Sequence, residues 1–254
     1  ADPDVLVYGE EFTEKVTDLR ESIDVDHYVA VGEQATKSDW IYESAIQGVA
    51  DAEATSGTDG DGVRRRMPDR DRTDTWGLLY TSGTTGRPKG VPQTFDMVLY
   101  NYLNIGIPID LTKDDTTLNV LPFFHTGGLN LYTNPTFVVG GTAVIQPTFD
   151  PGQALDLLEE RVSVFFGVPA IYNALRQQDD FAERDLSGVR SWSSGGAPMP
   201  ESTIEYYAER DIVIRQGMGM TETGPTLFLI DEAHAVEKAG SLGQPATFVD
   251  VKIV

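Results

Sequence analysis

The sequence predicts an α/β fold in which alternating strands and helices form sheets packed with helices. Short apolar runs, typical of buried strands, alternate with longer stretches whose apolar residues recur at helical spacing. This order favours parallel strands joined by crossover helices. The chain has 254 residues, 40% of them hydrophobic, which is enough for one large domain or two small ones.

Residues 1–54 are predicted to form an α/β segment of a first subdomain. Strands are expected at 5–8 and 27–32, with an amphipathic helix at 10–22 between them and a second helix at 38–52. His27 is expected at a strand start, without a chemical role. Residues 55–75 are rich in Gly, Asp and Arg and have almost nothing to bury, which predicts a linker or mobile loop. The three arginines at 64–66 are a candidate phosphate patch, but neighbouring aspartates favour a solvated loop.

Residues 76–240 are predicted to form the larger α/β core. Helices are expected at 95–103, 151–161 and 200–210; Asp150 and Met199 lie near the starts of the last two, and proline suits a first helical turn. Strands of the core are expected at 76–81, 117–121, 141–145, 162–167, 189–193 and 212–215.

Residues 241–254 are predicted to begin a further β-subdomain, because 247–254 alternate as a strand does. An edge strand fits that pattern, but a truncated chain explains it better.

The charge balance argues against several classes of partner. Nineteen Lys and Arg against forty Asp and Glu give a formal net charge of −21. Such a surface repels nucleic-acid phosphates and anionic lipid, and no apolar run is long enough to predict an integral membrane segment. An acidic, lysine-poor composition resembles that of halophilic proteins, with an ordinary acidic mesophilic protein as the alternative.

Cysteine usage and the N-terminus bear on the compartment. The chain has no cysteine, so the sequence offers no disulfide framework and no thiolate metal site. The N-terminus has neither the basic nor the apolar region of a secretory signal. Both observations agree with a cytoplasmic protein.

The segment YTSGTTGRPKGV at residues 80–91 carries the clearest chemical signal. Its glycines let the main chain approach a ligand closely, its hydroxyl residues stand beside backbone N–H groups, and Lys89 adds a mobile positive charge. These features predict a polyphosphate cradle that follows a strand, with a flexible surface loop as the alternative. It is not the P-loop of NTPases, because Arg87 and Pro88 separate the second glycine from the lysine.

This loop and four further segments resemble, in order, the motifs of the adenylate-forming (AMP-binding) superfamily. That superfamily includes acyl- and aryl-CoA synthetases, firefly luciferases and the adenylation domains of peptide synthetases. Five ordered segments across residues 76–245 make the resemblance specific, whereas a single glycine turn would be weak evidence. The four further segments are LPFFHTGG at 121–128, SSGGAPMP at 193–200, QGMGMTETG at 216–224 and GSLGQP at 240–245.

The resemblance implies a role for each matching position. Thr221 would contact the α-phosphate of ATP, and Glu222 would bind Mg²⁺, with Thr81 sharing the ion; oxygen ligands suit that metal. The catalytic group would comprise Lys89, His125, Thr221 and Glu222. The β- and γ-phosphates would be held by Thr81, Ser82, Gly83, Thr84, Thr85, Gly86 and Lys89. The adenine side of the site would comprise Gly196, Ala197, Pro198, Gln216, Gly217, Met218, Gly219 and Met220.

Two positions leave alternatives open. A residue at the place of His125 lines the acyl tunnel in relatives, whereas a lone histidine is more often packed and hydrogen-bonded. The flanking Phe123, Phe124 and glycines favour the functional interpretation. Met218 stands where relatives usually have a tyrosine that stacks on adenine. A thioether can also lie flat on a ring, so binding should survive, but affinity or selectivity for the nucleotide is in question.

The implied function is that of an AMP-forming acid–CoA ligase. Such an enzyme activates a carboxylic acid, here a fatty or aryl acid, with ATP and transfers the acyl group to coenzyme A. The family's ribose-binding Asp motif, hinge and C-terminal lid are not found in this sequence, so the parent protein would be the enzyme and this chain alone would be inactive. A luciferase-like or peptide-synthetase adenylation domain and a non-catalytic nucleotide-binding module are the alternatives. The acyl pocket is expected between residues 123–131, Trp192 and residues 217–220, but neither the acid nor the oligomeric state follows from the sequence.

Overall fold

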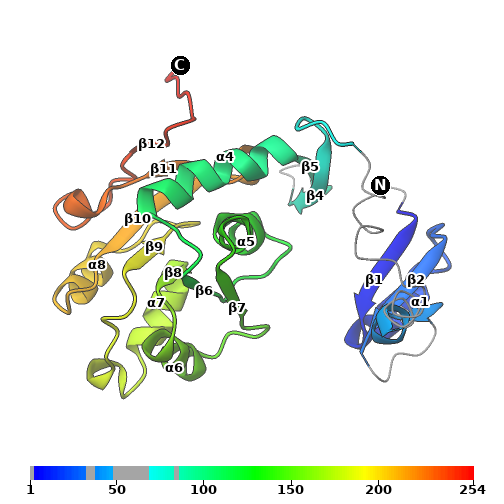
Figure 1. Cartoon of the computed structure of the whole chain (residues 1–254), viewed down its shortest axis with the longest axis horizontal. Coiled ribbons are helices and arrows are strands. Elements are labelled where there is room, and N and C mark those ends of the chain that lie inside the picture. Colours follow the sequence, from blue (N-terminus) through cyan, green and yellow to red (C-terminus); the bar gives the residue numbers. More distant parts are fainter. Residues whose placement is uncertain (1–2, 33–37, 48–68, 83–85) are drawn as a thin grey trace, which may run out of the picture. The chain divides into compact units, whose positions relative to one another are not determined.

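The computed structural model describes residues 3–32, 38–47, 69–82 and 86–254 (Figure 1). The chain divides into two compact units, Ala1–Asp69 and Arg70–Val254, each of which is described by itself. Most of the predicted linker, the arginines at 64–66 and the candidate phosphate ligands Gly83, Thr84 and Thr85 lie outside the described residues. In the described part of the chain, no helix combines the length and the apolar character needed to cross a membrane.

The first unit contains a small parallel sheet. Its strands β1 (Val5–Gly9), β2 (His27–Val31) and β3 (Trp40–Ile41) lie in the order β1-β2-β3. The connection from β1 to β2 is a 3-10 turn η1 (Glu10–Phe12) followed by α1 (Thr13–Leu19), and Val16 of this helix packs on Tyr8 and Tyr28. Both predicted strands and the helix between them are confirmed. The His27 ring lies against Trp40, with the ring centroids 4.6 Å apart.

The second unit is built on a seven-stranded sheet in the order β12-β11-β10-β9-β8-β6-β7. The five strands from β6 to β10 run parallel, and β11 and β12 extend the sheet in antiparallel pairing. The parallel strands are those that the alternation predicts. The bounds of the seven strands are β6 (Thr116–Asn119), β7 (Thr142–Ile145), β8 (Val164–Gly167), β9 (Ser191–Ser194), β10 (Ile214–Gly219), β11 (Thr226–Leu229) and β12 (Gln244–Pro245).

Helices cover both faces of this sheet. Phe165 of β8 belongs to a cluster with Leu155, Tyr172 and Ile204 of α6, α7 and α8, whereas its neighbour Val164 belongs to a second cluster with residues of α4. Successive side chains of a strand point to opposite faces, so the two clusters are the two cores. The helices are α4 (Phe95–Gly106), α5 (Thr133–Val139), α6 (Pro151–Glu160), α7 (Pro169–Arg176) and α8 (Glu201–Ala208), with short turns η2 (Ile107–Ile109), η3 (Gly127–Leu131), η4 (Phe181–Glu183), η5 (Thr221–Thr223) and η6 (Glu232–His234).

Local sequence explains where α6 begins. The Asp150 side chain accepts a hydrogen bond from the backbone N–H of Gln153 at 2.7 Å, and Pro151 occupies the first helical turn. In α8 the prediction was one residue early, since Pro200 is the N-cap and Glu201 begins the helix.

The helices α5 and α7 were not predicted. The sequence TNPTFVV of α5 is rich in residues that favour strands, so its helical form depends on packing.

The glycine loop joins two strands of a separate antiparallel hairpin. Strand β4 (Thr75–Thr81) pairs with β5 (Lys89–Thr94), and Thr81 lies opposite Lys89 (Figure 1). The strand β4 was predicted, but β5 was not. Its sequence KGVPQT contains glycine and proline, which are rare in strand interiors, and a two-stranded hairpin leaves free edges where a proline is tolerated.

The amino ends of the central strands are joined by a buried carboxylate. Asp115 precedes β6 and accepts hydrogen bonds from the Arg190 Nε (2.9 Å) and the Ser163 Oγ (2.7 Å), which precede β9 and β8. Burial alone would raise the pKa of Asp115. The hydrogen bonds from Arg190, Ser163 and the Thr112 backbone, together with the charge of Arg190, outweigh it and lower the pKa to about 2.

The prediction of a strand at 247–254 is wrong. These residues are irregular, and the last strand of the described chain is β12 at Gln244–Pro245. An alternating pattern shows which side chains could share a face, but a strand also needs a hydrogen-bonded neighbour. Residues 247–254 have no such neighbour among the described residues, and the Ile253 side chain is exposed.

Candidate functional site

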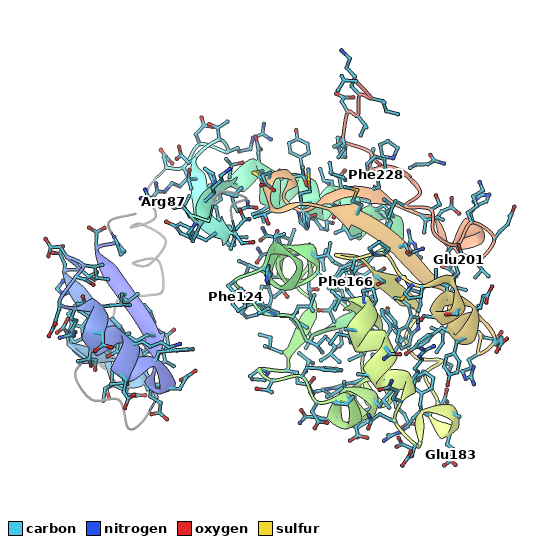
Figure 2. All side chains as sticks on the ribbon, turned by 180° about the vertical axis from the view of Figure 1, so that it is seen from behind. Arg87, Phe124, Phe166, Glu183, Glu201 and Phe228 are labelled. Atoms are coloured by element: carbon cyan, nitrogen blue, oxygen red, sulfur yellow. The ribbon has the colours of Figure 1, made fainter. Side chains whose placement is uncertain are left out.

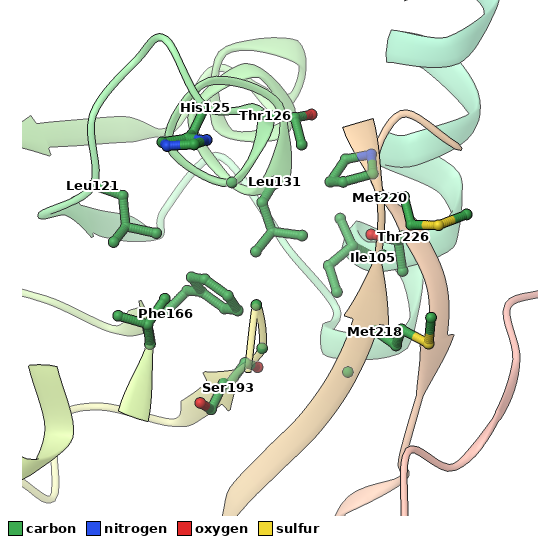
Figure 3. A pocket seen from close by; sticks show the side chains of 18 of the residues that line it. Ile105, Leu121, His125, Thr126, Leu131, Phe166, Ser193, Met218, Met220 and Thr226 are labelled. Carbon is green, nitrogen blue, oxygen red and sulfur yellow. The ribbon is translucent and has the colours of Figure 1, made fainter. Parts of the chain in front are cut away.

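A pocket of about 370 Å³ lies in the second unit, where the parallel strands β8, β9 and β10 end (Figure 3). Val168 lines it just after β8, residues 194–196 where β9 ends, and residues 217–220 where β10 ends. The carboxyl ends of neighbouring parallel strands meet at one edge of a sheet, and in open α/β sheets this edge is where ligands bind.

Apolar side chains form most of the inner surface. Ile105 of α4, Leu131 of η3, Phe166 of β8 and Phe228 of β11 all line the pocket. Figure 3 shows Leu121 and His125 on one side of the pocket and Met218 and Met220 on the other. No Asp, Glu, Lys or Arg occurs among the described lining residues. The interior therefore suits an uncharged, flat or apolar group.

Three motif segments that are distant in sequence converge on this pocket. They are residues 121–127, 193–196 and 217–221. Ala197 and Pro198 follow Gly196 in the same turn and are exposed, and Glu222 is exposed just beyond Thr221. Gln216 is buried, and its Oε1 accepts a hydrogen bond from the Met199 backbone at 3.3 Å. The predicted residues that line the pocket are His125, Gly196, Gly217, Met218, Gly219, Met220 and Thr221.

The predicted phosphate ligands lie on the hairpin and do not line the pocket. Thr81 is half-buried, whereas Ser82, Gly86 and Lys89 are exposed. Gly86 has a φ of +83°, a left-handed conformation that favours glycine. In Figure 2, Arg87 marks the hairpin, and Phe166 and Phe228 mark the pocket. The geometry brings the two predicted halves of the site into one unit but does not bring their side chains together.

The turn that carries Thr221 and Glu222 is held by a close backbone approach and by one hydroxyl group. A side chain at Gly219 would overlap the carbonyl oxygen of Pro225, so any other residue there would force the turn to shift. The Thr223 Oγ1 donates to the Pro225 carbonyl at 2.7 Å and accepts from the Met220 N–H at 3.1 Å. These contacts place Thr221 at the pocket and leave the Glu222 side chain in solvent.

His125 stands at the pocket wall, where the two interpretations of it can be compared. Its side chain is exposed, and its ring lies 4.9 Å from that of Phe124, between ring centroids. It does not belong to a packed core.

Trp192, expected beside the acyl pocket, is buried in the core against Phe165 and does not line the pocket. That expectation is wrong, because successive residues of β9 face opposite sides of the sheet and its neighbour Ser193 takes the pocket side.

Buried polar groups at the pocket offer places for a polar ligand. Ser194 is 1% exposed and lines the pocket, and its Oγ has no hydrogen-bond partner among the described residues. The buried Nε2 of Gln216 is likewise unpartnered within that part of the chain. Most buried polar atoms are hydrogen-bonded, so an orphan at a pocket calls for an explanation such as a ligand atom. Ser194 was not singled out from the sequence, although it lies within the quoted motif.

The structure also bears on a metal. Among the described residues, no group of three or more His, Cys, Asp or Glu is placed to hold an ion. Glu222 supplies one exposed carboxylate and Thr81 one hydroxyl. Mg²⁺ in nucleotide sites is usually bound through one or two carboxylates and completes its shell with phosphate and water, so the exposed Glu222 carboxylate has the chemistry that such an ion needs.

Known proteins share the sequence and the fold of this chain. It is 41% identical to a feruloyl-CoA synthase of an Amycolatopsis species over 177 residues, which are 69% of this chain and 36% of that protein. It is 41% identical over 181 residues to the long-chain-fatty-acid–CoA ligase FadD13 of Mycobacterium tuberculosis, covering 69% of this chain and 35% of that one. The crystal structure of the N-terminal domain of FACL13 from Mycobacterium tuberculosis matches with a TM-score of 0.76 at 31% identity, covering 96% of this chain and 57% of that one.

The match to the two enzymes thus spans little more than a third of their length. The model of the family described as AMP-binding enzyme matches residues 1–254, which is the whole of this chain. On this evidence the chain belongs to the family of AMP-binding enzymes.

Proposed function

We propose that the protein containing this chain is an AMP-forming acid–CoA ligase. The observation that carries the proposal is the convergence of residues 121–127, 193–196 and 217–221 on one pocket at the carboxyl ends of parallel strands. These are the segments that the family resemblance assigns to the acid, to adenine and to the α-phosphate. Relatives named as a feruloyl-CoA synthase and a fatty-acid–CoA ligase support the same reaction class.

The proposed reaction has two steps. A carboxylate oxygen of the acid attacks the α-phosphorus of ATP, the bond to pyrophosphate breaks, and an acyl-adenylate forms. The thiol of coenzyme A then attacks the acyl carbon, the carbon–oxygen bond to AMP breaks, and the thiol proton goes to solvent. Such phosphoryl chemistry depends on positioning and on neutralisation of charge.

Each site residue has a proposed part in positioning. Thr221 would contact the α-phosphate at the pocket, and Lys89 with the described loop residues Thr81, Ser82 and Gly86 would hold the β- and γ-phosphates. His125, at the pocket wall, would approach the carboxylate of the acid. Glu222, with Thr81, would hold Mg²⁺, which when bound neutralises phosphate charge.

We propose that the acid has a single carboxylate and an apolar body, as fatty and aryl acids do. Ile105, Leu131 and Phe166 offer such a body favourable contacts. No described lining residue is a lysine or an arginine, so a second carboxylate placed there would lose its hydration without a fixed positive charge to compensate it. On the adenine side, Met218 would lie against the ring in place of an aromatic side chain.

Acid-dependent exchange of labelled pyrophosphate into ATP tests the proposal. The full-length protein, screened with a panel of fatty, aryl and dicarboxylic acids, should exchange label only with a cognate apolar monocarboxylic acid. If no acid of the panel supports exchange although MgATP binds tightly, the result would favour a non-catalytic nucleotide-binding module. Formation of acyl-adenylate without acyl-CoA would favour a luciferase-like or peptide-synthetase activity.

The Lys89→Ala variant tests the phosphate-loop assignment. Loss of one fixed positive charge at the phosphates should lower the exchange rate by about a hundredfold and weaken MgATP binding in calorimetry at high salt. Lys238→Ala is the matched control, because Lys238 is exposed and lies outside the proposed site. Unchanged MgATP binding by Lys89→Ala would show that the loop assignment is wrong.

We further propose that the acidic composition is an adaptation to salt and that the protein is cytoplasmic. With a net charge of −21, screening of like charges should raise the thermal midpoint by about 5 °C or more between about 0.1 M and about 2 M KCl. Sucrose at equal osmolality does not screen charge, so an equal rise in sucrose would contradict the proposal. We also retain 76–240 as the nucleotide-binding core and 241–254 as the start of a β-subdomain. Of the predicted linker at 55–75, we retain the part that precedes the second unit, which begins at Arg70.

A further inference from the structure

Three buried amide side chains connect the glycine-loop hairpin to the pocket. Gln93 of β5 and Asn130 of η3 are each 0% exposed, and Asn101 of α4 is 3% exposed. An amide in the protein interior costs free energy unless its donors and acceptors are paired. All three amides are hydrogen-bonded, and their partners lie on segments far apart in sequence. We refer to Gln93, Asn130 and Asn101 as the amide network.

Gln93 links the hairpin to two turns of the pocket wall. Its Nε2 donates to the backbone carbonyl of Thr221 at 2.9 Å, and its Oε1 accepts from the Nδ2 of Asn130 at 3.1 Å. One side chain thus joins β5, the Thr221 turn and the η3 turn. The Thr221 turn is the one that we propose to contact the α-phosphate.

Asn130 and Asn101 extend the network around the pocket. The second N–H of the Asn130 Nδ2 donates to the Thr126 Oγ1 at 3.2 Å. The Asn101 Nδ2 donates to the Asn130 carbonyl at 2.6 Å, and its Oδ1 accepts from the Thr226 Oγ1 at 2.8 Å. Thr126, Thr221 and Thr226 all line the pocket, so three separate stretches of its wall are bonded to the same network.

The geometry of β5 relates Gln93 to the proposed phosphate ligand. Side chains alternate along a strand, so Lys89, Val91 and Gln93 share one face of β5. Gln93 is fully buried and Lys89 is exposed. The buried end of this face is therefore bonded to the Thr221 turn, and the exposed end carries the lysine. A displacement of Gln93 along the strand would displace Lys89 by the same amount.

We propose that Gln93 is a positioning residue that sets the place of the glycine-loop hairpin relative to the Thr221 turn. This inference rests on the proposed ligase function. Apolar packing is non-directional and would tolerate a shift of a two-stranded hairpin. An amide that donates to one segment and accepts from another specifies a single register, and in the interior such a bond is strengthened by the low dielectric constant.

The variants Gln93→Met and Gln93→Glu separate positioning from simple stability. Methionine keeps the volume of the side chain and removes both hydrogen bonds. A protonated glutamic acid keeps both, since its O–H donates to Thr221 and its carbonyl oxygen accepts from Asn130. The ionised carboxylate loses the donor and faces the Thr221 carbonyl. Burial raises the pKa of a carboxyl group, so the protonated form should persist to moderately acidic pH.

In the full-length protein, Gln93→Met should raise the KM for ATP in the exchange reaction by about tenfold and change the KM for the acid less than about twofold. The exchange rate of Gln93→Glu should approach that of the wild type at low pH and fall as the pH rises, because the carboxyl group ionises. Neither the wild type nor Gln93→Met should show this ionisation in its pH profile. Gln146→Met is the matched control, because Gln146 is buried and bonded to α6 and its N-cap, outside the amide network. Its KM for ATP should equal that of the wild type.

Two outcomes would overturn the inference. One is a folded Gln93→Met protein with an unchanged KM for ATP. The other is a parallel change in the KM for ATP and for the acid, with a lowered thermal midpoint and no new ionisation in Gln93→Glu, which would indicate a structural role only. If the wild type shows no acid-dependent exchange, the ligase proposal fails independently. MgATP calorimetry then decides the role of Gln93, since weaker binding by Gln93→Met supports it and equal binding contradicts it.

Discussion

The two ends of the parallel strands in the second unit use their polar side chains in opposite ways. At the amino ends, Asp115, Ser163 and Arg190 are bonded to one another. At the carboxyl ends, the wall of the pocket includes the buried Ser194 Oγ, which has no partner among the described residues. The amino ends therefore pair their charged groups with one another, which contributes stability, and the Ser191 Oγ there, also unpartnered within the described chain, lies away from the pocket. The unpartnered Ser194 Oγ at the carboxyl ends lines the pocket and is available to a ligand.

Two glycines, one near each end of the sheet, have different surroundings and offer a matched pair of substitutions. Gly188, just before β9, has no atom within 4 Å of the place where a side chain would begin. Gly219, at the end of β10, lies directly against the Pro225 carbonyl. Substitutions that break the Asp115–Arg190 pair at the amino ends should therefore act on stability, and substitutions that crowd the turn after Gly219 at the carboxyl ends should act first on ligand binding.

The largest effect on stability is expected from Arg190→Met. It leaves the Asp115 carboxylate, 5% exposed, without its cationic partner, which should lower the free energy of unfolding by about 3 kcal/mol. Urea unfolding measures this loss, and MgATP affinity should not change. Arg161→Met is the control, because Arg161 is exposed and a surface substitution usually costs less than about 0.5 kcal/mol. Equal losses in the two variants would remove the distinction between the ends of the sheet.

A smaller effect is expected from acid. Because the pKa of Asp115 is lowered from its usual 3.8 to about 2, its contribution to stability is complete above about pH 4 and is lost as the pH falls through about 2. Over that interval the free energy of unfolding of the wild type should fall by about 2 kcal/mol more than that of Asp115→Asn. If the free energy of unfolding depends on pH in the same way in the wild type and in Asp115→Asn, the Asp115 carboxylate does not make this contribution to stability.

The smallest effect on stability is expected from Gly219→Ala. The added methyl group must displace Pro225 and with it the turn that carries Thr221. We expect a loss of about 1 kcal/mol in stability, together with a fall in MgATP affinity that is larger than the loss in stability explains. Gly188→Ala is the matched control and should change neither quantity. If both glycine variants bind MgATP as the wild type does, the turn does not contact the nucleotide.

The candidate site could be predicted from sequence where its residues belong to motifs. Gly196, Gly217 and Thr221 line the pocket and were predicted, because they belong to segments that resemble the motifs of the adenylate-forming superfamily. Ile105, Phe166 and Phe228 also line it and could not be named. An apolar residue on a strand or helix has the same pattern whether it faces a core or a pocket, so only its position in the fold distinguishes the two.

The amide network was hidden for a related reason. Gln93, Asn101 and Asn130 are polar residues that a sequence would place on the surface, yet all are buried. Their partners are as far away in sequence as Thr221 and Thr226. Strand β5 escaped prediction because it contains Gly90 and Pro92, and the expected strand at 247–254 is absent from the described structure because no neighbouring strand pairs with it.

The sequence by itself determined the fold class, the order of the parallel strands along the chain and the family, since these depend on local periodicity and on short motifs. The tertiary structure decided which faces of those strands meet, and so placed Trp192 in the core and Ser193 at the pocket. It also showed that the glycine loop belongs to a hairpin bonded to the Thr221 turn through Gln93. Such long-range pairings are set by packing and by the need to satisfy buried polar groups, neither of which leaves a periodic trace in the sequence.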